Sequence, residues 1–201
     1  LPWMDFCMNG AGNWPECSRV NYSRQEISVG EDGCVQSALF ASEDNGTGVF
    51  FFHEGLTDRA IEDAMAVAYT PNTKANFVYL PCDLTKKSAP EWLDFYGKKY
   101  LIPSKAAVAF GDAGTDAVAL RDEFVWTLLV DASVPEFETT AGQRWYFAQT
   151  DDSDFYAGMA ALYRSCKKTG AMFEYRVIDG SGNAAEDRLR ALSKLRPYLS
   201  Y

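Results

Sequence analysis

The chain has 201 residues, of which 47% are hydrophobic and 14% aromatic, and this composition excludes a disordered chain and predicts a globular domain with a core. Its formal net charge of -9 at pH 7 argues against nucleic acid or an anionic membrane surface as the partner. No apolar run reaches the roughly 18–20 residues of a membrane span, so no transmembrane segment is expected.

Residues 1–25 are rich in Gly, Asn, Pro and Cys, which predicts an irregular N-terminal arm ahead of a single domain over residues 26–201. Cys7 and Cys17 flank a loop-like stretch that a disulfide could close. The cysteine count is odd, at five, and two N-x-[ST] triplets occur. The candidate disulfide and the triplets favour a secreted or organelle-lumen protein over a cytosolic one, while the odd cysteine count leaves at least one thiol free or paired between chains.

The domain begins with two alternating segments, 26–29 and 35–40, which flank turn residues and predict a hairpin. Residues 48–52 form a continuous apolar run, typical of a strand that is buried on both faces. Strand-like and helix-like segments then alternate. The expected strands are 76–80, 105–110, 125–131, 144–149 and 172–179, and the expected helices are 59–69, 89–100, 157–168 (with Gly170 as C-cap) and 184–195. This alternation predicts βαβ units and a mostly parallel sheet covered on both faces.

In such sheets, functional sites gather at the carboxyl ends of the strands. Four of the predicted strands end in polar motifs, which are "HEG" at His53 to Gly55, "FGDAGT" around Asp112, "AQTDDSD" from Asp151 and "DGSGN" up to Asn183.

The order of these motifs resembles the α/β-hydrolase fold, and most closely the dienelactone hydrolase family, over residues 26–185. That family has a His-Glu motif after its third strand, then a helix and a strand that ends in Pro-Asp-Leu. Here "HEGL" and "PCDL" follow that plan, with Cys82 inserted in the second motif. The resemblance implies a three-layer α/β sandwich, with a mostly parallel sheet and an antiparallel N-terminal hairpin.

The resemblance also assigns the site positions. The family's nucleophile turn, Gly-x-Cys-x-Gly-Gly, places Asp112 in the nucleophile position. The acid of the catalytic triad falls on Asp151, and the position of its histidine falls on Asn183. The implied pocket residues are His53, Glu54, Gly55 and Ala113.

Two of the three triad positions are therefore replaced, and this bears on the activity. A triad needs a base to activate the nucleophile or the attacking water, and the amide of Asn183 is not a useful base. We therefore predict a non-catalytic protein of the hydrolase fold, a pseudoenzyme that acts as a binding module or accessory subunit. Its partner would be another protein, with a small-molecule ligand in a residual pocket as a further possibility.

An active enzyme remains the alternative. It would be a hydrolase of small esters or lactones, with Asp112 as nucleophile and Asp151, Glu54 and His53 as the supporting groups. His53 is the only histidine in the sequence, and it serves either as the base or as a structural residue of its loop. Glu54 either shares a proton with Asp112 or turns to solvent.

The sequence predicts no cofactor and no metal site. Histidine and cysteine do not cluster as zinc or copper ligands do, and the acidic run 151–154 is interpreted as a solvated loop. Cys82 and Cys166 lie beside apolar positions and are interpreted as unreactive core residues. A flavodoxin-like binding protein is the remaining fold alternative.

Overall fold

The computed structural model of the chain describes residues 23–29, 34–40, 47–68, 77–99 and 102–200. The disulfide considered between Cys7 and Cys17 and the asparagines of both N-x-[ST] triplets lie outside these residues. The first strand begins at Ser23, so residues 23–25, which we expected in the arm, belong to the sheet.

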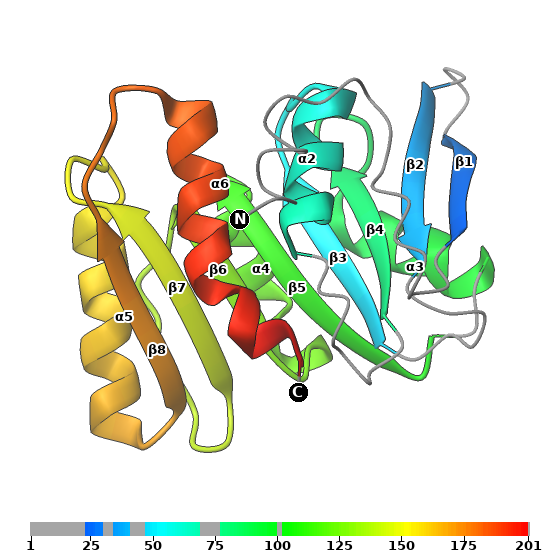
Figure 1. Cartoon of the computed structure of the whole chain (residues 1–201). Coiled ribbons are helices and arrows are strands. Elements are labelled where there is room, and N and C mark those ends of the chain that lie inside the picture. Colours follow the sequence, from blue (N-terminus) through cyan, green and yellow to red (C-terminus); the bar gives the residue numbers. More distant parts are fainter. Residues whose placement is uncertain (1–22, 30–33, 41–46, 69–76, 100–101, 201) are drawn as a thin grey trace.

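The strands of the described ranges form one sheet. They are β1 (Ser23–Val29), β2 (Cys34–Phe40), β3 (Thr47–His53), β4 (Phe77–Asp83), β5 (Ser104–Gly111), β6 (Thr127–Ala132), β7 (Arg144–Thr150) and β8 (Met172–Ile178). Their order is β1-β2-β4-β3-β5-β6-β7-β8 (Figure 1). β3 to β8 are parallel, whereas β2 is antiparallel to both β1 and β4. The predicted mostly parallel sheet with an antiparallel N-terminal pair is therefore confirmed.

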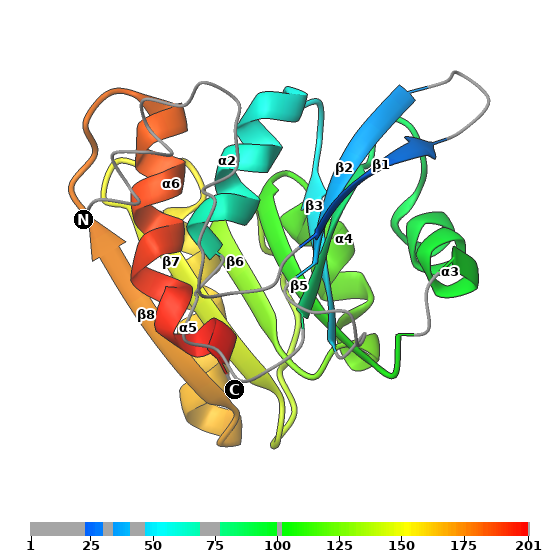
Figure 2. The ribbon, with the colours of Figure 1, turned by 45° about the vertical axis from the view of Figure 1, so that its right-hand side comes forward.

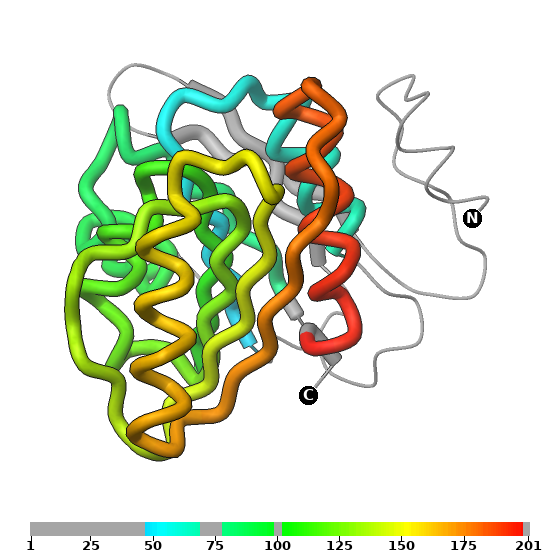
Figure 3. Tube along the Cα trace, turned by 90° about the vertical axis from the view of Figure 1, so that its left-hand side faces the viewer, coloured from blue at the N-terminus to red at the C-terminus, as the bar shows by residue number. Residues whose placement is uncertain are grey.

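Helices cover both faces of the sheet. They are α2 (Asp58–Ala68), α3 (Ala89–Lys99), α4 (Gly114–Ala119), α5 (Tyr156–Thr169) and α6 (Ala184–Leu195), with 3-10 turns η1 (Arg121–Glu123) and η2 (Arg196–Ser200). α2 and α6 lie on one face, and α3, α4 and α5 lie on the other (Figures 1 and 2). Figure 3 shows the sheet between α5 and α6, which gives the three layers that the sequence predicted.

The apolar run of β3 illustrates why the sheet is central. Val49 to Phe52 are all completely buried, because β3 pairs with β4 and β5 and helices pack on both of its faces. Phe50 and Phe52 join the core under α3, α4 and α5, where Trp92 is fully buried. Val49 and Phe51 join the second core, under α2 and α6. Burial on both faces explains the absence of alternation in this run.

The C-terminal end of α5 follows its sequence signal. Gly170 adopts the left-handed conformation with φ 76°, and its N–H donates to the Cys166 carbonyl at 3.0 Å. Cys166 and Cys82 are both buried and free, as expected of core residues. Burial raises the pKa of Cys166 to about 11 and raises that of Cys82 well above its usual value. Both thiols therefore stay protonated at neutral pH.

Because β3 to β8 are parallel, their carboxyl ends meet at one edge of the sheet. His53, Gly111, Ala132 and Thr150 all end strands at this edge. No helix among the described residues is long and apolar enough to cross a bilayer. The edge is where the topology favours a binding site.

Candidate functional site

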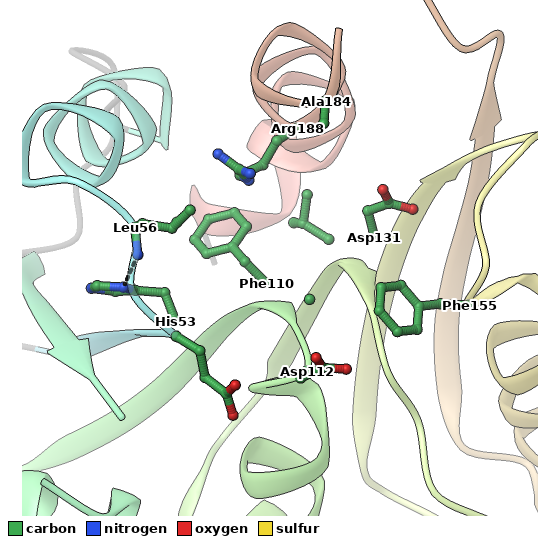
Figure 4. Close-up of a pocket in the computed structure, with 11 residues that line it drawn as sticks. His53, Leu56, Phe110, Asp112, Asp131, Phe155, Ala184 and Arg188 are labelled. Atoms are coloured by element: carbon green, nitrogen blue, oxygen red, sulfur yellow. Dashed lines mark hydrogen bonds between the residues drawn. The ribbon is translucent and has the colours of Figure 1, made fainter. Parts of the chain in front are cut away.

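A cavity of about 300 Å³ lies at the carboxyl edge of the sheet (Figure 4). It is bounded by the ends of β3, β5 and β6, by the residue before α5 and by the first turns of α6. The lining residues are His53, Glu54, Leu56, Phe110, Gly111, Asp112, Val130, Asp131, Phe155, Ala184 and Arg188. The size is at the lower end of the range of small-molecule sites.

The turn from β5 into α4 has its strained residue at Gly111. The φ of Gly111 is 55°, and a side chain added there would meet no atom within 4 Å. Asp112, which the sequence placed at the tip, follows one residue later, without a positive φ, and is exposed on the rim of the cavity. In a nucleophile elbow, the attacking side chain belongs to the residue at the strained tip. The structure gives that tip to a glycine.

Small residues on both sides of Gly111 allow the sharp turn. Ala109 and Ala113 lie two residues before and after it, as the glycines do in a G-x-S-x-G elbow. Gly114 begins α4, and an added Cβ there would lie 2.2 Å from the Ser133 carbonyl oxygen. This spacing of small residues is the sequence signal that identifies Gly111, and not Asp112, as the tip.

The side chain of His53 stabilises the turn that follows β3. Its Nδ1 accepts a hydrogen bond from the Leu56 N–H at 3.2 Å, and the side chain is only 1% exposed. Burial lowers the pKa of His53 to about 4, although the nearby Asp83 carboxylate acts to raise it. Figure 4 shows the imidazole pointing away from Asp112. The ring is thus neutral at pH 7 and is held in a structural position.

Asp83 fastens the same turn from the end of β4. Its Oδ1 accepts hydrogen bonds from the Gly55 N–H at 3.2 Å, the Thr85 N–H at 3.0 Å and the Thr85 hydroxyl at 2.7 Å. Burial raises the pKa of Asp83, but these hydrogen bonds outweigh it and bring the pKa below its usual value. Gly55, with φ 66°, makes the turn and does not line the cavity as we expected.

Three further expected site residues do not line the cavity. The Oδ1 of Asp151 accepts a hydrogen bond from the Gly180 N–H at 3.0 Å, so this carboxylate joins the loops after β7 and β8. The side chain of Asn183 caps α6, where its Oδ1 accepts from the N–H groups of Ala185 and Glu186 at 3.2 and 3.3 Å. Ala113 is fully buried and packs in the core under α4. The structure therefore does not bring Asp112, Asp151 and Asn183 together around the cavity.

The capping role of Asn183 gives a prediction. We expect Asn183→Ala to lower the free energy of unfolding by about 1 kcal/mol, because the substitution removes the side-chain acceptor of two helix N–H groups. Asn183→Asp, which keeps the acceptor, is expected to stay close to the wild type. Urea unfolding followed by tryptophan fluorescence measures both. Equal stability of the two variants would contradict the capping role.

Asp131 is a residue of the cavity that the sequence analysis missed. Phe110 pairs with Val130 and Gly111 pairs with Ala132, so Asp131 is an extra residue in β6, a β-bulge. Its φ of 47° is the one positive value at a non-glycine residue in the described ranges. The expected strand 125–131 included this residue, but an alternating pattern does not reveal a bulge. Bulges of this kind re-aim side chains next to functional sites.

Arg188 is the only cation that lines the cavity within the described residues. It lies in the second turn of α6 and is partly buried. Burial lowers the pKa of its guanidinium, and the Asp131 carboxylate opposes this effect. No hydrogen bond or ion pair to the guanidinium occurs among the residues that the structure describes.

Glu54 and Asp112 are both exposed where they line the cavity. No hydrogen bond joins their carboxylates in the described part of the chain, so the proposed acid pair has no direct contact here. In the loop 151–154, the three aspartates are exposed. The described residues contain no group of three or more His, Cys, Asp or Glu that could hold a metal ion.

No protein-family model matches the sequence, and no curated protein matches it significantly. Solved structures do resemble it. A ferulic acid esterase superposes with a TM-score of 0.61 at 11% identity, over 90% of this chain and 98% of its own. The Francisella virulence factor BioJ gives 0.62 at 12% identity, over 92% and 86% of the two chains. FphF, a fluorophosphonate-binding serine hydrolase of Staphylococcus aureus, gives 0.62 at 7% identity, over 92% and 100%.

These likenesses cover nearly the whole chain, but at low identity. They therefore establish the fold: the chain has the α/β-hydrolase fold that its motifs resembled. Fold alone does not fix an activity, which depends on the residues of the site.

Proposed function

We propose that this chain is a non-catalytic protein of the α/β-hydrolase fold, whose cavity at the carboxyl edge serves in binding. The observation that carries the proposal is the glycine at the tip of the elbow. Gly111 has the strained φ of 55° at the strand-to-helix turn and offers no atom that could attack an ester. The predicted protein partner, or a role as accessory subunit, is part of the same proposal.

The single histidine supports the same conclusion. Acyl transfer on this fold needs a base within hydrogen-bond reach of the nucleophile or of the attacking water. His53 is the only histidine in the sequence, its Nδ1 already accepts the Leu56 N–H, and its ring points away from Asp112 (Figure 4). With a pKa of about 4 it is also a weak base.

An ester or lactone hydrolase is the second candidate, and one observation favours it. Asp112 lines the cavity next to the elbow tip, where its carboxylate could attack the carbonyl carbon of a bound ester, forming a mixed anhydride as the bond to the alcohol oxygen breaks and the alcohol leaves. Hydrolysis of that intermediate would require an activated water, and Glu54, which lines the same cavity, is the group that could activate it.

An assay with chromogenic short-chain esters and an aromatic lactone separates the two candidates. We expect the wild type to hydrolyse them no faster than buffer does, and we expect Asp112→Asn to behave identically. A fluorophosphonate probe should also leave the protein unlabelled, whereas a serine esterase run in parallel is labelled. Turnover by the wild type that is lost in Asp112→Asn would overturn the proposal and favour the hydrolase.

A further inference from the structure

The cavity contains two opposite charges that do not pair with each other. Asp131 comes from the bulge of β6 and Arg188 from α6, and both line the same space. No ion pair joins them in the described ranges, and Figure 4 shows the two charged groups on different sides of the cavity. Both groups have lost part of their water without gaining a hydrogen bond or an ion pair in the described ranges, which is unfavourable unless a ligand supplies one.

The carboxylate of Asp131 needs a donor. Its Oδ1 is buried and has no hydrogen-bond partner among the described residues. In a regular strand, Asp131 would lie on the face of Leu129, under α4 and α5. The bulge shifts the register, so that Ala132 takes that face and Asp131 lines the cavity. The chain thus keeps a strained φ of 47° at the residue that presents a buried acceptor.

The guanidinium of Arg188 needs an acceptor. Burial lowers its pKa, which reflects the unfavourable desolvation of the cation. The neighbouring residues of α6 are engaged elsewhere. Asp187, for example, accepts the Ser181 N–H at 2.9 Å and a hydrogen bond from Arg190 at 2.9 Å. Arg188 is therefore free to bind a planar anion such as a carboxylate.

Apolar side chains form part of the remaining wall. Leu56, Phe110, Val130 and Phe155 line the space around the two charges. Glu54 and Asp112 also line it, but they are exposed and can remain hydrated. A ligand that fits this arrangement has an ammonium group, a carboxylate group and a small apolar body.

We propose that the cavity binds a small zwitterion of the amino-acid type, with its ammonium group on Asp131 and its carboxylate on Arg188. This inference rests on the proposed binding function and names the ligand class. The apolar body of the ligand lies against the phenylalanine walls. No bond is made or broken, so the ligand is released unchanged.

Three probes with the same apolar body test the charge pattern: L-phenylalanine, 2-phenylethylamine and 3-phenylpropionate. We expect isothermal titration calorimetry of the full chain to show the tightest binding for L-phenylalanine. Each single-charge probe should bind at least about tenfold more weakly, because it leaves one partly buried charge of the protein without a partner. If 2-phenylethylamine or 3-phenylpropionate bound as tightly as L-phenylalanine, the ligand class would be an amine or a carboxylate and the proposal would be overturned.

Two substitutions that each remove one charge test the two contacts. We expect Asp131→Asn and Arg188→Gln each to weaken L-phenylalanine binding by about tenfold or more, while Asp151→Asn leaves it unchanged. Asp151 is the matched control, because its carboxylate lies at the same edge of the sheet but does not line the cavity. Circular dichroism checks that each variant is folded. If Asp131→Asn does not fold, Arg188→Gln alone still tests the site.

The outcomes distinguish this inference from the proposed function. No binding of L-phenylalanine, or binding unaffected by both substitutions, overturns the zwitterion site and leaves the absence of catalysis standing. Ester turnover that depends on Asp112 overturns the non-catalytic role, whatever the calorimetry shows.

Discussion

Replacing Gly114 by alanine is expected to lower the free energy of unfolding by about 3 kcal/mol. A Cβ at this position would lie 2.2 Å from the Ser133 carbonyl oxygen and 2.9 Å from the Ala132 Cβ. The nearer of these is a backbone atom of the segment after β6, which has no rotamer by which to move away. α4 would have to shift off the sheet, and the packing of Ala117 and Val118 in the core would loosen.

Gly97 is the matched control for this substitution. It lies inside α3, is exposed, and an added Cβ would meet nothing within 4 Å. Gly97→Ala should therefore stabilise the protein by about 0.5–1 kcal/mol, since alanine is the better helix former. Chemical denaturation of both variants gives the comparison. If Gly114→Ala were as stable as the wild type, α4 would not pack against the sheet as closely as described.

Acidification is expected to destabilise the protein through His53. In the folded state its pKa is about 4, against 6.5 for the free side chain, so the unfolded chain takes up the proton first as the pH falls. The contribution of neutral His53 is complete above about pH 6.5 and is lost progressively towards about pH 4. Each pKa unit is worth about 1.4 kcal/mol, so the loss reaches about 2 kcal/mol near pH 5 and about 3 kcal/mol at most.

Because the sequence has a single histidine, no other imidazole contributes to this pH dependence. Urea unfolding at several pH values between about 7 and about 5 gives the slope in a range where most carboxylates remain ionised. His53→Asn, whose amide oxygen can accept the Leu56 N–H, should remove most of that slope. The two imidazole C–H signals of the proton NMR spectrum, which both belong to His53, should titrate near pH 4. A midpoint near 6.5 would mean that the ring is exposed to water.

Most of the fold was predictable because local patterns and tertiary packing agree. The run at 48–52 and the alternation of strands with amphipathic helices gave the parallel sheet, and Gly170 marked the end of α5. Boundaries moved by a few residues at most, as between the expected strand 125–131 and the observed β6. These predictions depend on burial, which the sequence records in its spacing of apolar residues.

The site was less predictable, because its key features lie in the backbone. Gly111 and Asp131 owe their roles to positive φ angles, and an extra residue in one strand has no signature in alternation. The tip of the turn after β5 was placed one residue too late. Comparison of motifs put Asp112 there, although the small residues Ala109 and Ala113 centre the turn on Gly111. The capping role of Asn183 could have been predicted from the sequence, since asparagine is a favoured residue at the N-cap of a helix.

The open space beside Gly111 makes the elbow a natural point of attachment for a reporter. A cysteine in its place would project its thiol into the cavity, with strain of the order of 1 kcal/mol for a non-glycine residue at that backbone angle. The native thiols of Cys82 and Cys166 are buried and protonated and would not compete for a maleimide dye, and Cys7, Cys17 and Cys34 would first be replaced by serine. Fluorescence from such a label would then register the occupancy of the cavity directly.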